Sequence, residues 1–214
     1  MKKYLISFVM LSAISICVNA QVSKEIKLND PDLTRGSNIM EAFSKRSSVR
    51  EYSEKNLSLQ DLSDLIWAAI GINRPESGKL TAPTAMNDQE ISLYVCFKEG
   101  VYLYDAKKHS LILVTEGDLR PVLAERQDFV KTAPVVLVIV ADTSKFYKNS
   151  TKGEKELYCA IDAGIVSQNI SIFCAGTNMG TVPRGWMNKE EFKKILNLND
   201  SQIVYLNHPI GYLK

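Results

Sequence analysis

The sequence feature that most constrains the fold is the run APVVLVIVA, from Ala133 to Ala141. The run is apolar throughout and rich in β-branched residues, with no alternation of apolar and polar positions. A strand with one solvated face alternates, so a continuous apolar run of this length indicates a strand that is buried on both faces. Residues 133–141 are therefore expected to form a central strand of the sheet.

Other elements can be placed around this strand from their periodicity and end signals. Residues 91–97 alternate cleanly, and two turns lead from them into further short strands at 101–104 and 111–114, which predicts an antiparallel meander. We expect helices near 38–45, from Ser58 to Gly71, over 118–126, over 154–176 and from Asn188 through Leu196, and a last strand over 203–206. This mixture predicts an α+β fold.

The longest predicted helix, 154–176, carries an apolar side with a small notch at Gly164. A helix this apolar requires burial along its length, and a glycine in its apolar side permits another helix to approach closely. The partner of that side is either a second subunit or another part of the same chain. The apolar side is expected to consist of Leu157, Ala160, Ile161, Gly164, Ile165, Gln168, Ile172 and Phe173.

Residues 1–20 are predicted to be a signal peptide. Two lysines precede an almost wholly apolar run, and Val18-Asn19-Ala20 suits cleavage before Gln21. A lipoprotein anchor at Cys17 is less favoured because Ile16 stands where a small residue is needed, and a retained membrane anchor is a further alternative. These three interpretations place the rest of the chain outside the cytoplasm, with the periplasm as the expected compartment, whereas an ordinary buried helix would not.

The remaining chain is long enough for one domain at 38–214, preceded by an irregular polar lead-in at 21–37. Without Lys2 and Lys3, basic and acidic residues balance at 24 each, so no nucleic acid or anionic surface is implied. Two distant histidines make a histidine metal site improbable, and no metal is expected. Three cysteines remain, Cys96, Cys159 and Cys174, and their spacing indicates small core residues rather than a disulfide framework.

The segment KRSSVREY, residues 45–52, is the first candidate site. Arg46 and Arg50 each offer a planar fork of donors, and Ser47 and Ser48 add hydroxyl and backbone N–H groups. Such a set suits a dianionic phosphate. Because the segment follows the end of a helix, where the dipole disfavours anions, the side chains must supply the attraction. The alternative is a solvated basic turn.

Two further polar stretches interrupt the fold. The connection 71–89 ends in APTAMNDQ, where Pro83 stiffens the turn and Thr84, Asn87 and Gln89 offer groups that suit a planar heterocycle and a polyol. By themselves these residues could equally form an ordinary turn. The stretch 180–187, GTVPRGWM, is a tight turn with glycine on both sides of Pro183-Arg184.

Together these stretches resemble the nitroreductase family of flavoproteins over roughly Asn38 to Tyr212. KRSSVREY is similar to the R-S-x-R segment that follows the family's first helix. APTAMNDQ is similar to the family's P-S-x-x-N-x-Q, with Thr84 in place of serine. GTVPRGWMNKEEFKKIL, followed by a strand and PIGY, is similar to the family's C-terminal half.

The resemblance implies an α+β nitroreductase-like fold with a central, mainly antiparallel sheet flanked by helices, in an intertwined homodimer with two FMN molecules at its interface. Carried over by position, one set of residues holds the FMN phosphate, a second set from the other subunit lines the flavin, and a third lies beside the isoalloxazine with a backbone N–H near N5. The three sets are Arg46, Ser47, Ser48 and Arg50; Pro83, Thr84 and Asn87; and Pro183, Arg184 and Gly185.

The activity implied is that of an exported FMN-dependent oxidoreductase, which passes a hydride through flavin N5 to a small-molecule acceptor. No catalytic acid or base is expected from the protein, although Arg50 or Arg184 could stabilise the anionic reduced flavin. The usual donor of the family, NAD(P)H, is scarce outside the cytoplasm. A non-catalytic domain that binds flavin or another ligand is therefore the alternative, and a cytoplasmic enzyme with a misread start is a third.

Overall fold

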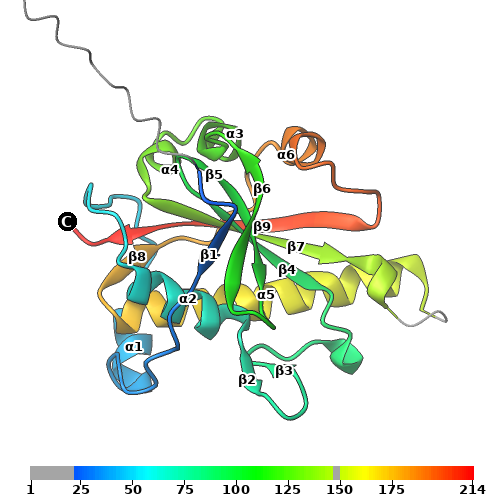
Figure 1. The fold of residues 1–214 in the computed structure, drawn as a ribbon, viewed down its shortest axis with the longest axis horizontal. Helices are drawn as coiled ribbons and strands as arrows, with labels where there is room; N and C mark the ends of the chain where they lie inside the picture. Colours follow the sequence, from blue (N-terminus) through cyan, green and yellow to red (C-terminus); the bar gives the residue numbers. More distant parts are fainter. Residues whose placement is uncertain (1–21, 147–149) are drawn as a thin grey trace, which may run out of the picture.

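The computed structural model describes residues 22–146 and 150–214, and the predicted signal peptide lies outside them. Every pairing in the main sheet is antiparallel, and its strand order is β1-β6-β5-β4-β7-β9-β8 (Figure 1). The strands are β1 (Glu25–Lys27), β4 (Ile91–Cys96), β5 (Gly100–Asp105), β6 (Ser110–Glu116), β7 (Val135–Asp142), β8 (Met179–Thr181) and β9 (Gln202–Tyr212). The α+β fold, the antiparallel sheet and the meander are confirmed.

The central position predicted for 133–141 is confirmed by β7. This strand pairs with β4 on one side and β9 on the other, and its residues from Val135 to Ala141 are all buried. Alternate side chains enter two different apolar clusters: Leu137 and Ile139 pack on one face of the sheet, and Val136 and Val138 pack on the other. Burial on both faces removes the need for alternation, which is why the run reads as continuously apolar.

Helices cover both faces of the sheet (Figure 1). On one face lie α1 (Ile39–Lys45), α2 (Leu59–Ile70) and α5 (Lys152–Gly176), and on the other lie α3 (Arg120–Ala124), α4 (Phe129–Thr132) and α6 (Lys189–Ile195). Short polar side chains begin several of them: Asn38 caps α1, Ser58 caps α2, and Thr151 forms a capping box with Glu154 at α5.

Several boundaries differ from the sequence expectation. The lead-in is not wholly irregular, since β1 pairs with β6 at the edge of the sheet. The connection 71–89 contains a small hairpin formed by β2 (Ile72–Arg74) and β3 (Lys79–Leu80), followed by a 3₁₀ helix, η1 (Ala85–Asn87). A second 3₁₀ helix, η2 (Thr143–Lys145), follows β7. The last strand is much longer than 203–206, because it pairs with β7 as far as Ile210 and with β8 as far as Tyr212. Its polar Asn207 and His208 are buried. The ring of His109, in the turn between β5 and β6, bonds to the Tyr104 hydroxyl at 2.9 Å and to the Asn29 carbonyl at 2.8 Å.

Helix α5 is buried on a different side from the one predicted. The residues that face the sheet and α2 include Ala163, Val166 and Ile170, whereas Leu157 and Ile161 of the predicted apolar side are 58% and 48% exposed. A Cβ added at Gly164 would meet nothing within 4 Å. An internal partner for the notch is therefore excluded within the described residues. The expectation for the cysteines is confirmed, since Cys96, Cys159 and Cys174 are free and buried.

Candidate functional site

The basic segment after α1 is fixed to the C-terminal half of the chain by backbone hydrogen bonds. The Arg46 N–H donates to the Ala42 carbonyl at 3.0 Å and ends the helix, and the Val49 N–H donates to the Thr181 carbonyl at 2.9 Å. The Tyr52 hydroxyl then donates to the Val49 and Pro209 carbonyls. The segment therefore runs beside β8 and the end of β9, and Arg46, Ser47, Ser48 and Arg50 are all exposed along it.

A cavity of about 340 Å³ lies at the base of this segment. No acidic residue lines the cavity, and Lys45 and Ser47 are among its lining residues. Two exposed guanidinium groups, two hydroxyls and an adjoining cavity without acidic groups fit a phosphate monoester. The lining residues are Lys45, Ser47, Val49, Ser171, Cys174, Ala175, Asn178, Met179, Thr181 and Leu213.

Gly180 allows the basic segment to lie this close to β8. A Cβ built at Gly180 would come within 2.6 Å of Val49 Cγ1 and 3.0 Å of Leu213 Cδ2. Contacts this short cannot be accommodated without displacing the segment, so a side chain at this position would act on the candidate phosphate site as well as on stability.

We expect Gly180→Ala to lower the free energy of unfolding by about 1–3 kcal/mol, which is the usual cost of an overpacked position. Urea titration followed by circular dichroism measures the change. Gly153→Ala is the matched control, because a Cβ at Gly153 meets nothing within 4 Å and alanine favours a helix. Equal stability of the Gly180→Ala and Gly153→Ala proteins would contradict the close approach.

The turn at 83–89 is held against the middle of α5. The Ala85 N–H donates to Asp162 Oδ2 at 2.9 Å, and the Gln89 N–H donates to the Thr84 hydroxyl at 3.0 Å. Met86, Asn87 and Gln89 have positive φ, which projects the turn outward with Pro83 and Asn87 exposed. The Thr84 hydroxyl is thus used within the turn as an acceptor.

Within one chain, this turn and the basic segment are far apart. The turn is anchored at Asp162, while the cavity beside Ser47 includes Cys174 of the same helix. That difference in position corresponds to about 18 Å along a straight α-helix. A single copy of the chain therefore does not bring Thr84 and Asn87 to the exposed arginines.

The third stretch, 183–185, does lie beside the basic segment. Arg184 exchanges backbone hydrogen bonds with Asn207 at 2.9 and 2.8 Å, and Thr181, which binds the Val49 N–H, is only two residues before Pro183. Pro183 and Gly185 are exposed. Two of the three predicted stretches thus meet on one chain at the ends of β8 and β9.

The Arg184 side chain, however, is 6% exposed and packed among the helices of the opposite layer. Its Nε donates to Gln127 at 2.6 Å, and one terminal nitrogen donates to Asn207 Oδ1 and the Leu123 carbonyl. Its guanidinium lies over the Phe129 ring, and burial lowers its pKa by disfavouring the charged form. The expectation that this cation could serve a reduced flavin is therefore less favoured than the same role for exposed Arg50.

Sequence reasoning missed His208, which lies behind these two stretches. Its ring is fully buried, with Nε2 2.7 Å from the Ser167 hydroxyl and Nδ1 3.1 Å from the Thr181 hydroxyl. Burial lowers the pKa of His208 to about 3, so the ring is neutral at ordinary pH. It joins α5, β8 and β9 and so fixes the strand to which the basic segment is bonded. No local sequence pattern around His208 signals this role.

A second missed group is the carboxyl of Glu90, beside the turn at 83–89. It is fully buried, and neither oxygen has a hydrogen-bond partner among the described residues. Burial, and then the nearby carboxylates of Asp162 and Asp88, raises the pKa of Glu90 to about 8. Glu90 is therefore protonated at neutral pH, next to the carboxylate that anchors Ala85. Within the described ranges, no three His, Cys, Asp or Glu side chains are grouped to hold a metal ion.

Comparison with known proteins gives one consistent result. The family model described as "Nitroreductase family" matches residues 43–212. A provisionally named nitroreductase of Methanocaldococcus jannaschii is 30% identical over 200 residues, covering 88% of this chain and 92% of that protein.

Solved structures agree. A provisionally named nitroreductase of Ralstonia eutropha superimposes with a TM-score of 0.84 at 34% identity, with 90% of each chain covered. Another provisionally named nitroreductase, from Anabaena variabilis, superimposes with a TM-score of 0.72 at 19% identity, and the match covers 89% of this chain and 42% of the Anabaena chain. This likeness shows the fold alone. The matched range contains all three candidate stretches.

Proposed function

The chain belongs to the nitroreductase family and is an oxidoreductase of that type, and on this premise we propose that it binds FMN and transfers hydride between a reduced donor and a small-molecule acceptor. The observation that carries the proposal is the exposed pair Arg46 and Arg50, bonded through Val49 to the strand that leads into 183–185. A phosphate bound by the arginines would leave the flavin ring within reach of that turn.

The roles of the chain's own groups follow from this placement. FMN, when bound, supplies the ring that accepts and returns the hydride. Arg46 and Arg50 bind and orient its phosphate, Ser47 and Ser48 add hydrogen bonds, and the exposed backbone at Gly185 offers an N–H beside the ring. Arg50, whose side chain is exposed, could favour the anionic reduced ring. Specific proton transfer by a protein side chain is not required.

We also propose that the working unit is a homodimer built on α1 and α5. These helices contact each other, and both expose apolar side chains: Ile39, Met40 and Phe43 on α1, and Leu157 and Ile161 on α5. Unpaired apolar surface of this kind favours association. A second copy would also supply Thr84 and Asn87, because in one chain their turn is anchored on α5 about 18 Å along the helix from the cavity beside Ser47.

The homodimer predicts a specific effect at the notch of α5. We expect Gly164→Glu to shift the protein to monomers, because a charged side chain in an apolar interface is left without water or a partner. Gly153→Glu, on the exposed first turn of the same helix, should leave the assembly unchanged, since neither position is crowded within the chain. Sedimentation velocity measures the masses. Identical dimers from both variants, or a monomeric parent protein, would contradict this interface.

The test of the main proposal is flavin binding followed by reduction. The purified chain saturated with FMN should show a flavin absorption spectrum that survives desalting, and anaerobic NADH or NADPH should bleach it. Bleaching by dithionite alone would favour the alternative, a flavin-binding domain without nicotinamide turnover. A colourless protein after desalting would overturn both.

Export is a separate part of the proposal. The basic and apolar pattern of residues 1–20 supports it. Intact-mass analysis of the protein from its native source should give a chain that begins at Gln21. A full-length mass in a cytoplasmic fraction would favour the misread start instead.

A further inference from the structure

The main sheet divides between β4 and β5. These strands pair at only three positions, from Tyr94 opposite Leu103 to Cys96 opposite Val101. The same register continued would set Leu93 opposite Tyr104 and Ser92 opposite Asp105, but neither pair forms. Meanwhile β4 stays paired with β7 along its whole length, and β5 stays paired with β6. The strands therefore diverge from that point.

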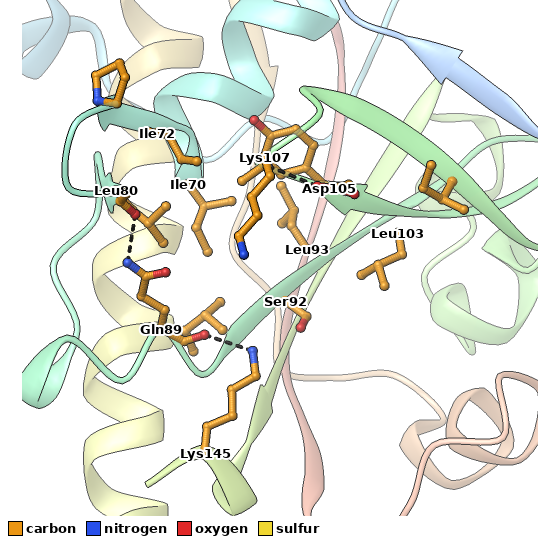
Figure 2. Close-up of a pocket in the computed structure, with 16 residues that line it drawn as sticks. Ile70, Ile72, Leu80, Gln89, Ser92, Leu93, Leu103, Asp105, Lys107 and Lys145 are labelled. Carbon is orange, nitrogen blue, oxygen red and sulfur yellow. Dashed lines mark hydrogen bonds between the residues drawn. The ribbon is translucent and has the colours of Figure 1, made fainter.

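A cavity of about 880 Å³ occupies this divergence (Figure 2). Its volume is in the range of cavities that bind drug-sized molecules. Apolar side chains come from three sides: Ile70 at the end of α2, Leu80 of the β2–β3 hairpin, and Leu93 and Leu103 of the separated strands. Gln89, the last residue of the turn at 83–89, is among its lining residues, whereas no residue of 46–50, 83–87 or 183–185 is.

Two lysines bring positive charge to the mouth of the cavity. Lys107, on the β5–β6 turn, and Lys145, after β7, extend toward the space between them from opposite sides (Figure 2). The Lys145 ammonium donates to the Gln89 carbonyl at 2.9 Å, which holds it at the rim. One carboxylate, Asp105, also lines the cavity, and its Oδ1 accepts the backbone N–H groups of Lys107 and Lys108. The charged lining groups thus sum to one net positive charge.

We propose that this cavity binds a monoanionic amphipathic carboxylate, with its head between Lys107 and Lys145 and its apolar body against the walls. One net positive charge at the mouth matches a monoanion better than a phosphate dianion or a cation. The apolar wall offers an alkyl or aryl body a place away from water. The site does not depend on flavin binding, so it goes beyond the proposed oxidoreductase activity.

The test is calorimetric titration of the full chain with octanoate, octylamine and 1-octanol, which share the apolar body and differ in the head. We expect one octanoate per chain, and binding of octanol and octylamine weaker by about tenfold or more, the effect of losing one charge-assisted contact. Undetectable octanoate binding at 5 mM, or octylamine binding as tightly as octanoate, would overturn the proposal.

Variants locate the bound molecule. Lys107→Met and Lys145→Met should each weaken octanoate binding about tenfold, whereas Lys108→Met, on the same turn but outside the cavity lining, should not change it. Ser92→Trp should abolish binding by filling the cavity, with retained folding checked by circular dichroism. Equal effects of Lys107→Met and Lys108→Met would point to general surface charge and refute the assigned site, as would unchanged binding to a folded Ser92→Trp protein.

Discussion

Replacing Arg46 and Arg50 together with glutamine is expected to weaken FMN binding about 100-fold or more, because each charge-assisted contact to a phosphate contributes about 1.5–3 kcal/mol. Both side chains are exposed, so the substitution should leave the folded chain intact. Riboflavin lacks the phosphate, and its binding should change little. Quenching of flavin fluorescence measures both affinities.

The control for this prediction is Arg126→Gln, an exposed arginine outside the three candidate stretches. It should leave FMN binding unchanged, because it removes one surface charge without removing a contact to the phosphate. Equal losses for FMN and riboflavin in the double variant would show that the arginines act on the ring or on folding. Unchanged FMN binding would remove the phosphate site altogether.

Replacing Glu90 with glutamine is expected to stabilise the protein in alkaline solution by several kcal/mol. The native state keeps a proton on Glu90 up to pH of about 8, whereas the unfolded chain releases it near 4.5. Between these values the native state binds more protons, so the stability that Glu90 contributes below pH 4.5 is lost as the pH rises to about 8. The slope is about 1.4 kcal/mol per pH unit. Glutamine does not titrate, so the substitution should remove this pH dependence of the free energy of unfolding.

Urea titrations at pH 5, 7 and 8.5 measure the effect. The Glu90→Gln and parent proteins should be nearly equal in stability at pH 5 and should diverge progressively at the higher values. Glu76→Gln, at an exposed position in the β2–β3 hairpin, should follow the parent protein throughout. If the free energies of unfolding of the Glu90→Gln and parent proteins change in parallel between pH 5 and 8.5, the buried carboxyl does not titrate in this range.

Much of the fold was predictable because single segments carry strong signals. The unbroken apolar run of β7 required two covered faces, and Ser58 and Gly71 marked the ends of α2. The buried side of α5 was not predictable in the same way. That helix places small residues such as Ala163 on the sheet and larger apolar residues such as Ile161 outside, so hydrophobicity alone selects the wrong side.

The candidate site was predictable only in part. The exposed residues of 45–50 have a local composition that suits phosphate, and their order with 83–87 and 183–185 carried the family resemblance. The groups that position them depend on tertiary contacts instead. His208 and Glu90 have no surrounding motif, and each becomes buried only when strands distant in sequence are brought together. Likewise, the sequence around Arg184 does not show that its guanidinium packs against α3 and α4.

The neighbouring positions Ile161 and Asp162 on α5 have a consequence for how the protein would behave on dilution. Ile161 points outward from the fold, while Asp162 points inward and binds the Ala85 N–H. In the proposed homodimer, α5 would contact the second subunit on one side and the 83–87 turn on the other, so subunit association and the position of the turn would be linked. Flavin retention should therefore fall together with assembly as the protein is diluted below the dissociation constant of the proposed dimer.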